Sequence, residues 1–161
     1  MEEKEEIDDM TFDIKLADRV VRIHAIYDYI KEYSKDDVLS KQEENSEESR
    51  CDFEVTVTQS DIDFERTKSA AEDRKEGITI RHFTDEYLET LAVYRKIAEQ
   101  MLSYDTILFH GSVIAVDGFG YLFTAKSGTG KSTHARLWRE NFGDRAVMVN
   151  DDKPLLQITK D

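Results

Sequence analysis

Three segments in the first hundred residues alternate between apolar and polar positions, which is the pattern of a half-buried β-strand. They are residues 11–17, 53–58 and 78–83. The stretch after the first of them is ambiguous, because residues 20–23 favour a strand whereas residues 27–33 favour a helix. The alternation therefore predicts several strands in this part of the chain.

A helical period of three and four residues follows Thr84, which we expect to be the N-cap of a long helix. Asp85 and Glu86 then lie in the first turn, where the helix dipole favours negative charge. The apolar positions of the repeat are Tyr87, Leu88, Leu91, Tyr94, Ile97, Ala98, Met101 and Leu102. Such a stripe is expected to pack against a sheet as part of the core.

Polar segments separate these elements. Residues 61–76 are predicted to be helical in part, and Gly77 is expected to end that helix. Residues 34–50 consist almost entirely of Lys, Asp, Glu, Ser, Gln and Asn, so we expect a mobile loop there. Residues 1–9 are too acidic to pack and are expected to be frayed.

The pattern changes after Tyr104, where short apolar runs predict a second group of strands. These runs are residues 107–109, 113–116, 121–124 and 146–150. Asp117-Gly118 predicts a hairpin turn between the second and third of them. We expect the third strand to be buried, the fourth to be central in a sheet, and a helix to begin near Lys131.

The composition excludes several classes of protein. The chain has 161 residues, of which 35 are acidic and 22 basic, and a formal net charge of −13. An acidic surface argues against nucleic acid as a partner, because phosphates require clustered Lys and Arg. Cys51 is the only cysteine, so we expect a structural thiol and no disulfide. No apolar run reaches membrane length and the N-terminus is acidic, so we expect a cytoplasmic protein without a membrane partner.

The segment Ser127-Gly-Thr-Gly-Lys-Ser-Thr133 has the chemistry of a phosphate-binding loop. Gly128 and Gly130 can adopt φ > 0, which lets successive backbone N–H groups turn toward one anion. The following helix N-terminus adds N–H donors and partial positive charge. The candidate nucleotide-binding residues are Ser127, Gly128, Thr129, Gly130, Lys131, Ser132 and Thr133. Lys131 can reach the β- and γ-phosphates of ATP and the Ser132 hydroxyl can bind Mg²⁺. The alternative is a Gly- and Ser-containing turn before a helix.

Two adjacent acids follow the last predicted strand. Asp151 and Asp152 stand 20 and 21 residues after Lys131, which leaves room for one helix and a returning strand. Mg²⁺ takes one or two carboxylates together with phosphate oxygens and water. Because neighbouring side chains of an extended segment point to opposite sides, one acid can bind metal while the other faces an acceptor. The alternative is an acidic turn before Pro154.

Four segments occur in one order and at short spacings in the second part of the chain. They are Phe109-His-Gly-Ser112, Asp117-Gly118, Ser127-Gly-Thr-Gly-Lys-Ser132 and Asp151-Asp152. Together they resemble the HPr kinase/phosphorylase and phosphoenolpyruvate carboxykinase branch of the phosphate-loop proteins. The longer runs 121–134 and 151–155 look most like uncharacterised bacterial HPr-kinase-like proteins. The resemblance is specific over residues 104–156 and weaker before them.

The resemblance implies a fold, a reaction and roles for individual residues. The fold would be an α/β phosphate-loop kinase core with a mixed sheet and flanking helices over residues 104–161, preceded by an α/β region with α+β character over residues 1–103. The reaction would be phosphoryl transfer from ATP with Mg²⁺ to a hydroxyl acceptor. Its catalytic residues would be His110, Lys131 and Asp151, with Asp151 as the base, and its metal ligands would be Ser132 and Asp152.

The chain also departs from the family pattern. Ala125 replaces the first glycine of the loop motif, and no arginine near the C-terminus is placed to stabilise the transferred phosphoryl group. Because relatives continue beyond the equivalent of Asp161, we expect an incomplete core that is less stable alone or self-associates. Two alternatives stay open, a nucleotide-binding or assembly module without catalysis and a carboxykinase-like enzyme. The acceptor could be a protein serine, a peptide or a small molecule.

Overall fold

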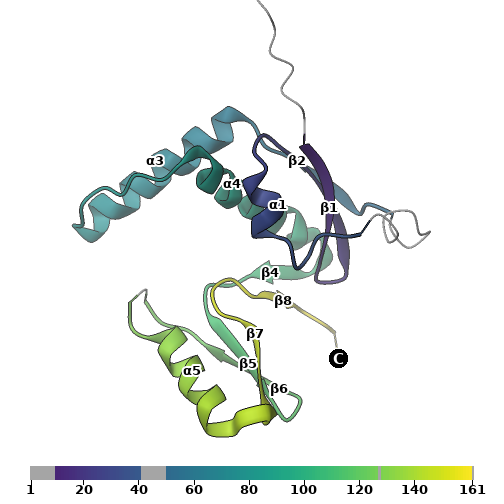
Figure 1. The fold of residues 1–161 in the computed structure, drawn as a ribbon, viewed down its shortest axis with the longest axis vertical. Helices are drawn as coiled ribbons and strands as arrows, with labels where there is room; N and C mark the ends of the chain where they lie inside the picture. Colours follow the sequence, from purple (N-terminus) through teal and green to yellow (C-terminus); the bar gives the residue numbers. More distant parts are fainter. Residues whose placement is uncertain (1–9, 41–49, 127, 161) are drawn as a thin grey trace, which may run out of the picture. The chain divides into compact units, whose positions relative to one another are not determined.

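The structure is a computed structural model that contains both helices and strands (Figure 1). It describes residues 10–40, 50–126 and 128–160. The expectations for residues 1–9, for residues 41–49 and for Ser127 lie outside these ranges. Within them, the combination of helices and strands agrees with the predicted mixed class of fold.

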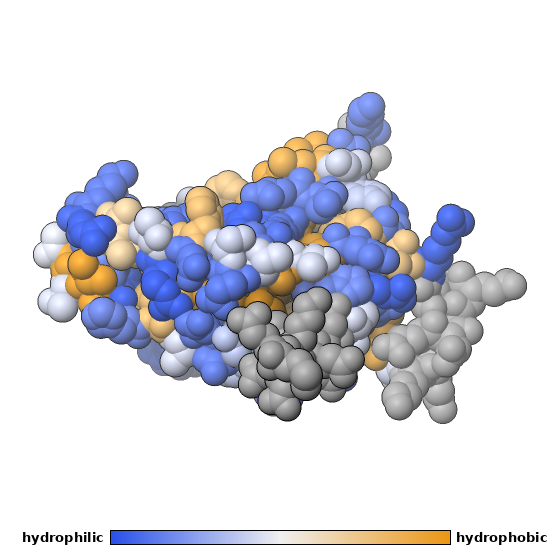
Figure 2. Space-filling view, turned by 90° about the horizontal axis from the view of Figure 1, so that it is seen from above, coloured by the Kyte–Doolittle hydropathy of each residue, from blue (hydrophilic) through white to orange (hydrophobic). Residues whose placement is uncertain are grey.

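The chain divides into two compact units, Met1–Gln100 and Met101–Asp161, and each is described by itself. Hydrophilic residues predominate on the face seen in Figure 2, with apolar residues in small groups between them, as the high content of charged residues leads one to expect. No helix in the described ranges has both the length and the apolar character needed to cross a membrane.

The first unit contains a mixed three-stranded sheet in the order β1-β2-β3. Its strands are β1 (Met10–Leu16), β2 (Arg19–Ala25) and β3 (Phe53–Thr56). β1 and β2 are antiparallel, whereas β2 and β3 are parallel. Ile14, Val21, Ile23 and Val55 are buried, as alternation predicts for one face of a sheet. The three strands expected from the pattern of residues 11–17, 20–23 and 53–58 are therefore confirmed.

The described part of this unit also contains the helices α1 (Tyr29–Tyr33), α3 (Gln59–Glu76) and α4 (Asp85–Met101). The Tyr87 amide donates to the Thr84 hydroxyl at 3.4 Å, which confirms the predicted N-cap. Gly77 ends α3 with φ 70°, in the left-handed region. The polar segment before it is helical throughout, and Arg95 of α4 bonds to its Glu65 at 2.6 Å and to its Asp61 at 3.3 Å.

The buried stripe of α4 differs from the predicted one. The fully buried apolar residues are Leu88, Ala92, Val93, Ile97 and Met101. Tyr87, Leu91, Tyr94 and Ala98 are only half-buried, and Leu102, just after the helix, is exposed. The stripe is rotated because Glu89 also faces inward, where its carboxylate accepts bonds from the amides of Ile26 at 2.6 Å and Tyr27 at 3.1 Å.

The prediction of a strand at residues 78–83 is wrong. This segment follows α3 as an extended chain without a strand partner in the described ranges, and it folds back on the end of the helix. The Arg81 amide donates to Oδ2 of the buried Asp73 at 2.8 Å, and its guanidinium bonds to Oδ1 at 2.7 Å. The Ile78 amide donates to the Asp73 carbonyl at 3.0 Å. Asp73 thus accepts hydrogen bonds from backbone amides that a neighbouring strand would otherwise accept.

The first part of the predicted mobile loop is attached to β1. The Lys15 amide donates to the Asp37 carbonyl at 2.8 Å, and the Leu39 amide donates to the Asp13 carbonyl at 2.9 Å. Val38 forms an antiparallel bridge with Ile14. Residues 37–39 are therefore paired with the edge of the sheet, contrary to the expectation of mobility.

Cys51 behaves as a structural thiol. Its Sγ donates to the Phe53 carbonyl at 2.9 Å, and the side chain is half-buried. Burial raises the pKa of the Cys51 thiol, which the neighbouring Arg22 only partly offsets. A thiol with a raised pKa is a weak nucleophile, in agreement with the expected role.

In its described residues, the second unit has two antiparallel sheets and one α-helix. One sheet pairs β4 (Thr106–Leu108) with β8 (Leu155–Gln157), and the other has the order β6-β5-β7. The strands of the second sheet are β5 (Ser112–Val116), β6 (Phe119–Phe123) and β7 (Ala146–Asn150). α5 (Lys131–Phe142) connects β6 to β7. The expected mixed pairing is found in the first unit, whereas every pairing described in the second unit is antiparallel.

The hairpin between β5 and β6 has the predicted turn. Asp117 and Gly118 both have positive φ, 51° and 84°, as a two-residue turn matched to twisted strands requires. Arg145 Nε bonds to Asp117 Oδ1 at 3.0 Å and so fixes the tip of the hairpin to the chain after α5. The turn signal in the sequence is therefore confirmed.

Two expectations about burial in this sheet are wrong. β6 was expected to be buried and β7 central, but β5 is the central strand and the other two lie at the edges of the described sheet. Tyr121 of β6 is 40 % exposed, and Val147 of β7 is 60 % exposed. An apolar run has the same appearance in a central strand and in an edge strand with one covered face, so the sequence does not separate them.

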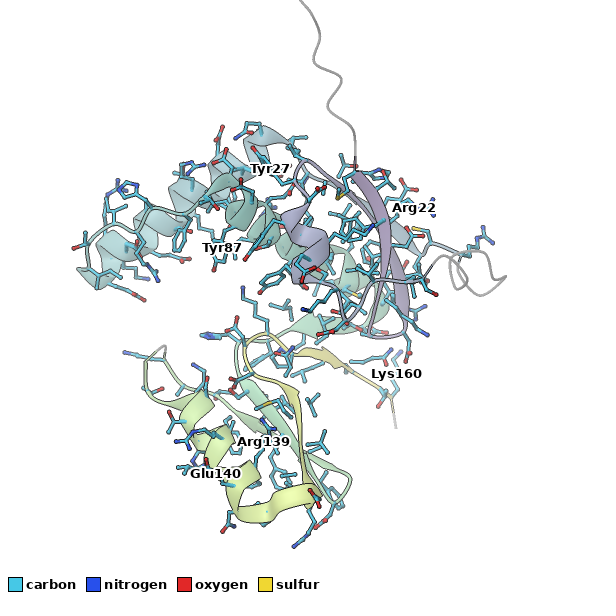
Figure 3. All side chains as sticks on the ribbon, in the orientation of Figure 1. Arg22, Tyr27, Tyr87, Arg139, Glu140 and Lys160 are labelled. Carbon is cyan, nitrogen blue, oxygen red and sulfur yellow. The ribbon has the colours of Figure 1, made fainter. Side chains whose placement is uncertain are left out.

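α5 covers one face of the β6-β5-β7 sheet. A cluster of Ile114, Val116, Ala135 and Ala146 is buried there, and half-buried aromatic side chains pack around it. Trp138 lies 5.1 Å from Phe123 and 5.2 Å from Phe142 between ring centroids. The last turn of α5 carries Arg139 and Glu140 on its surface (Figure 3). This packing fixes the position of α5 relative to the strand that leads into it.

Candidate functional site

Three segments that the sequence singled out meet at one end of the β6-β5-β7 sheet. β5 is antiparallel to both neighbours, with Phe123 of β6 opposite Ser112 and Asn150 of β7 opposite Val113. The chain after β6 and the chain after β7 therefore both emerge beside the start of β5. Neighbouring strands lie about 4.8 Å apart, so the ends of β6 and β7 are separated by about 10 Å.

The segment after β6 forms a tight loop. Gly128 and Gly130 have φ of 79° and 92°, the left-handed conformation that the motif was expected to need. The Thr129 hydroxyl donates to the Lys126 carbonyl at 2.6 Å, and the Thr129 amide donates to the same oxygen at 3.3 Å. Ala125 is not among the residues with positive φ, so its methyl group is tolerated in place of glycine.

Lys131 lies over this loop. Its ammonium donates to the Ala125 carbonyl at 3.0 Å and lies 3.5 Å from the Lys126 carbonyl. An ammonium so placed adds positive charge to a loop whose backbone can supply N–H donors. Lys131 and the loop, both predicted from the sequence to bind phosphate, therefore lie together.

The loop leads directly into the N-terminus of α5. Gly130 is the N-cap residue and has no side chain that could occupy the first amides of the helix. Its carbonyl accepts a hydrogen bond from the His134 amide at 2.9 Å. Ser132 and Thr133 are exposed in the first turn. A helix of twelve residues has free N–H groups and a partial positive charge at this end, which favour an anion.

Gly111 lies between the end of β6 and the chain after β7. Its amide donates to the Asp152 carbonyl at 3.0 Å. A Cβ at this position would lie 2.8 Å from the Phe123 carbonyl oxygen and 2.9 Å from Leu122 Cδ1. Glycine is required here by the close approach of a neighbouring backbone, so this residue ties the two flanking segments to the start of β5.

The two acids lie in a bend instead of the extended segment that was expected. The Asn150 side-chain oxygen accepts from the Asp152 amide at 3.0 Å and the Lys153 amide at 2.8 Å. Such a turn is typical of Asn, and the run Asn-Asp-Asp-Lys-Pro contained the signal for it. Asn150, whose side chain orients the acids, was not among the residues predicted for the site.

The carboxylates of the bend have different partners. The buried Ser112 hydroxyl donates to Asp151 Oδ1 at 2.7 Å, whereas Asp152 Oδ1 lies 3.6 Å from His110 Nε2. His110 and Asp152 are exposed. The structure therefore brings His110, Asp151 and Asp152 together, and Ser112 joins them although it was not among the predicted site residues.

A β-bulge lies immediately before the acids. Val113 is opposite Asn150 while its neighbour Ile114 is opposite Met148, so Val149 is the extra residue of β7. Bulges redirect side chains and occur often beside functional sites. This bulge sets the direction in which Asn150 and the bend leave the sheet.

The predicted metal ligands, Ser132 and Asp152, lie on segments that emerge at the same end of the sheet. Among the described residues, no three His, Cys, Asp or Glu side chains group as a set of metal ligands. Mg²⁺ bound beside phosphates keeps waters and takes only one or two carboxylates, so its chemistry fits a hydroxyl and a carboxylate that act with a polyphosphate.

An open groove of about 690 Å³ lies beside the loop, between the end of β6 and the first turns of α5. Leu122, Phe123 and Leu137 form much of its apolar surface. Thr129, Lys131 and His134 are among its polar residues. The groove therefore shares residues with the loop and extends away from it along α5.

Comparisons of the chain with models of protein families, with curated proteins and with solved structures gave no match. In the described ranges the geometry of the site joins a loop with two left-handed glycines, an ammonium, a helix N-terminus, a histidine and two carboxylates at one end of a sheet.

Proposed function

We propose that the second unit binds the polyphosphate of ATP with Mg²⁺ and transfers the γ-phosphoryl group to a hydroxyl acceptor. The observation that carries this proposal is the register of β5, which brings the loop after β6 and the acids after β7 to the same end of one sheet. Phosphoryl transfer depends on positioning and on neutralising charge, and both kinds of group are present there.

The proposed roles are those that the resemblance implies, and the contacts support them. The backbone of residues 127–133 and the Lys131 ammonium bind the phosphates, with the N-terminus of α5 adding its partial charge. Ser132 and Asp152 would hold Mg²⁺, which would neutralise charge on the phosphates. His110 lies 3.6 Å from Asp152 and would add a further polar group beside that carboxylate.

Asp151 is the proposed base for the acceptor hydroxyl. The Ser112 hydroxyl bonds to one of its oxygens at 2.7 Å, which fixes the carboxylate and leaves the other oxygen for the acceptor. The Asp151 carboxylate contacts Ser112, whereas the Asp152 carboxylate faces His110, so we assign the two acids different roles. We further propose that this unit has the phosphate-loop core of the HPr kinase and carboxykinase type, which the order of its motifs supports.

The experiment that tests the reaction is ³¹P NMR of the protein with Mg·ATP, with and without peptides that contain serine. We expect phosphate resonances that shift on binding and a slow release of ADP, which falls by roughly 10²–10⁴-fold in Asp151→Asn. Asp144→Asn, an exposed acid after α5, is the matched control. Binding without ADP release would support the non-catalytic alternative, and a requirement for a small dicarboxylate would support carboxykinase-like chemistry.

A further inference from the structure

We propose that the groove between the end of β6 and the first turns of α5 binds the aromatic base of the nucleotide, a proposal that rests on the proposed function. The groove has a volume of about 690 Å³, within the range of small-molecule sites. Thr129, Gly130 and Lys131 line it and also belong to the phosphate loop. A ligand whose phosphates lie on the loop can therefore extend into the groove without leaving the surface of the protein.

The chemistry of the groove suits a planar, uncharged ring. His134 is exposed, and its ring is held perpendicular to that of Phe123, at 4.8 Å and 88°. Leu122 and Leu137 are 39 % and 49 % exposed. Bases stack on the faces of aromatic and imidazole rings and pack against leucine, so these three side chains form a surface of the required kind.

The charge of the groove also fits a nucleotide. None of the described residues that line it is acidic, although 35 of the 161 residues of the chain are. Its cationic side chain is Lys131, at the end nearest the loop. The charge therefore lies at the end where the phosphates bind, and the apolar surface lies beyond it.

Trp138 provides a direct reporter of this groove. It is the only tryptophan in the chain, and its ring lies 6.2 Å from His134 and 5.1 Å from Phe123. A base that stacks on His134 changes the surroundings of Trp138, whereas phosphates on the loop alone do not touch this aromatic group. Its emission can therefore separate occupancy of the groove from occupancy of the loop.

The test compares three probes on the full chain: ATP, ribose 5-triphosphate, which lacks only the base, and inorganic tripolyphosphate. We expect ATP to bind about 5- to 100-fold more tightly than ribose 5-triphosphate, in keeping with the usual contribution of base stacking. Only ATP should change the fluorescence of Trp138. His134→Ala and Leu137→Ala should remove the advantage of ATP and leave the affinity for tripolyphosphate unchanged. Arg136→Ala, on the same helix but paired with Glu140 and outside the groove, is the control.

The outcomes separate the two proposals. Equal affinities for ATP and ribose 5-triphosphate in the wild-type protein would overturn the base site while leaving the phosphate loop intact. An equal loss of affinity for all three probes in His134→Ala would also overturn it. If none of the three probes binds the wild-type protein, the phosphate loop fails, and the base site fails with it.

Discussion

The hydroxyl of Ser112, a fully buried residue at the start of β5, bonds to Oδ1 of Asp151 at 2.7 Å and lies 3.2 Å from the carbonyl oxygen of the same residue. One side chain of the central strand therefore holds both the carboxylate and the backbone of an acid that follows the edge strand β7. The position of Asp151 depends on this contact.

Ser112→Ala should destabilise the second unit by about 1–2 kcal/mol, because a buried hydrogen bond to a charged group is lost. Denaturant unfolding followed by Trp138 fluorescence measures this unit. Ser103→Ala, at an exposed serine after α4, should be close to neutral. Equal unfolding midpoints for the two variants would mean that the Ser112 contact contributes nothing.

Gly111→Ala should be more damaging than Gly120→Ala, although both residues have φ outside the left-handed region. A methyl group at Gly111 would lie 2.8 Å from a backbone oxygen of β6, whereas at Gly120 the nearest side-chain atom is 4.0 Å away. We expect a cost of about 1–3 kcal/mol for the first change and almost none for the second. Similar stabilities in denaturant would contradict the close approach of β6 to the start of β5.

Substitution by asparagine should have different effects at Asp151 and at Asp152. Asp152→Asn should weaken Mg²⁺-dependent binding of ATP and leave metal-free binding almost unchanged, because it is the proposed metal ligand. Asp151→Asn should leave Mg·ATP affinity nearly intact, since loss of a nearby negative charge does not disfavour a polyphosphate. Calorimetry with and without Mg²⁺ distinguishes the variants. The reverse pattern would exchange the two roles, and no effect of either change would leave the pair as a simple turn.

The stability of the first unit should fall in acid partly through Asp61. Burial raises the pKa of Asp61, but hydrogen bonds from Lys96 and Thr58 outweigh this effect and lower the pKa to about 2. A lowered pKa stabilises the folded unit above the ordinary value of 3.8, and this contribution is lost as the pH falls toward 2.

The variant Asp61→Asn isolates that contribution. Near neutral pH the wild-type protein should be more stable than the variant by about 1 kcal/mol, because solvent around this partly exposed carboxylate screens part of the equivalent of the shift in pKa. The difference should shrink between pH 5 and pH 2, as measured by urea unfolding followed by far-ultraviolet circular dichroism. A difference that is independent of pH would exclude Asp61 as the titrating group.

Local signals in the sequence predicted much of this structure. The strands predicted at residues 11–17 and 53–58, the Asp117-Gly118 turn, the Thr84 cap and the start of α5 at Lys131 each depend on a few neighbouring residues, and each is confirmed. The glycine conformations of the loop were likewise encoded in its spacing. Short-range rules suffice where the chemistry is local.

The errors concern contacts between distant residues. Whether β6 and β7 are central depends on which strand pairs between them, and their apolar runs do not contain that information. The segment after Gly77 alternates like a strand, yet Asp73 on the preceding helix takes its hydrogen bonds. The parts that Asn150 and Ser112 play in orienting the acids also appear only when β7 is placed beside β5.

The central claim is that the loop with Lys131 binds a polyphosphate. The most direct measurement is calorimetric titration of inorganic tripolyphosphate into the wild-type protein, into Lys131→Ala and into Arg139→Ala, which removes the same charge from the last turn of α5. We expect Lys131→Ala to weaken binding by about 1–3 kcal/mol, because the loss is that of a charge-assisted contact, and Arg139→Ala to match the wild type. Equal affinities for Lys131→Ala and the wild type would show that the loop is not the site.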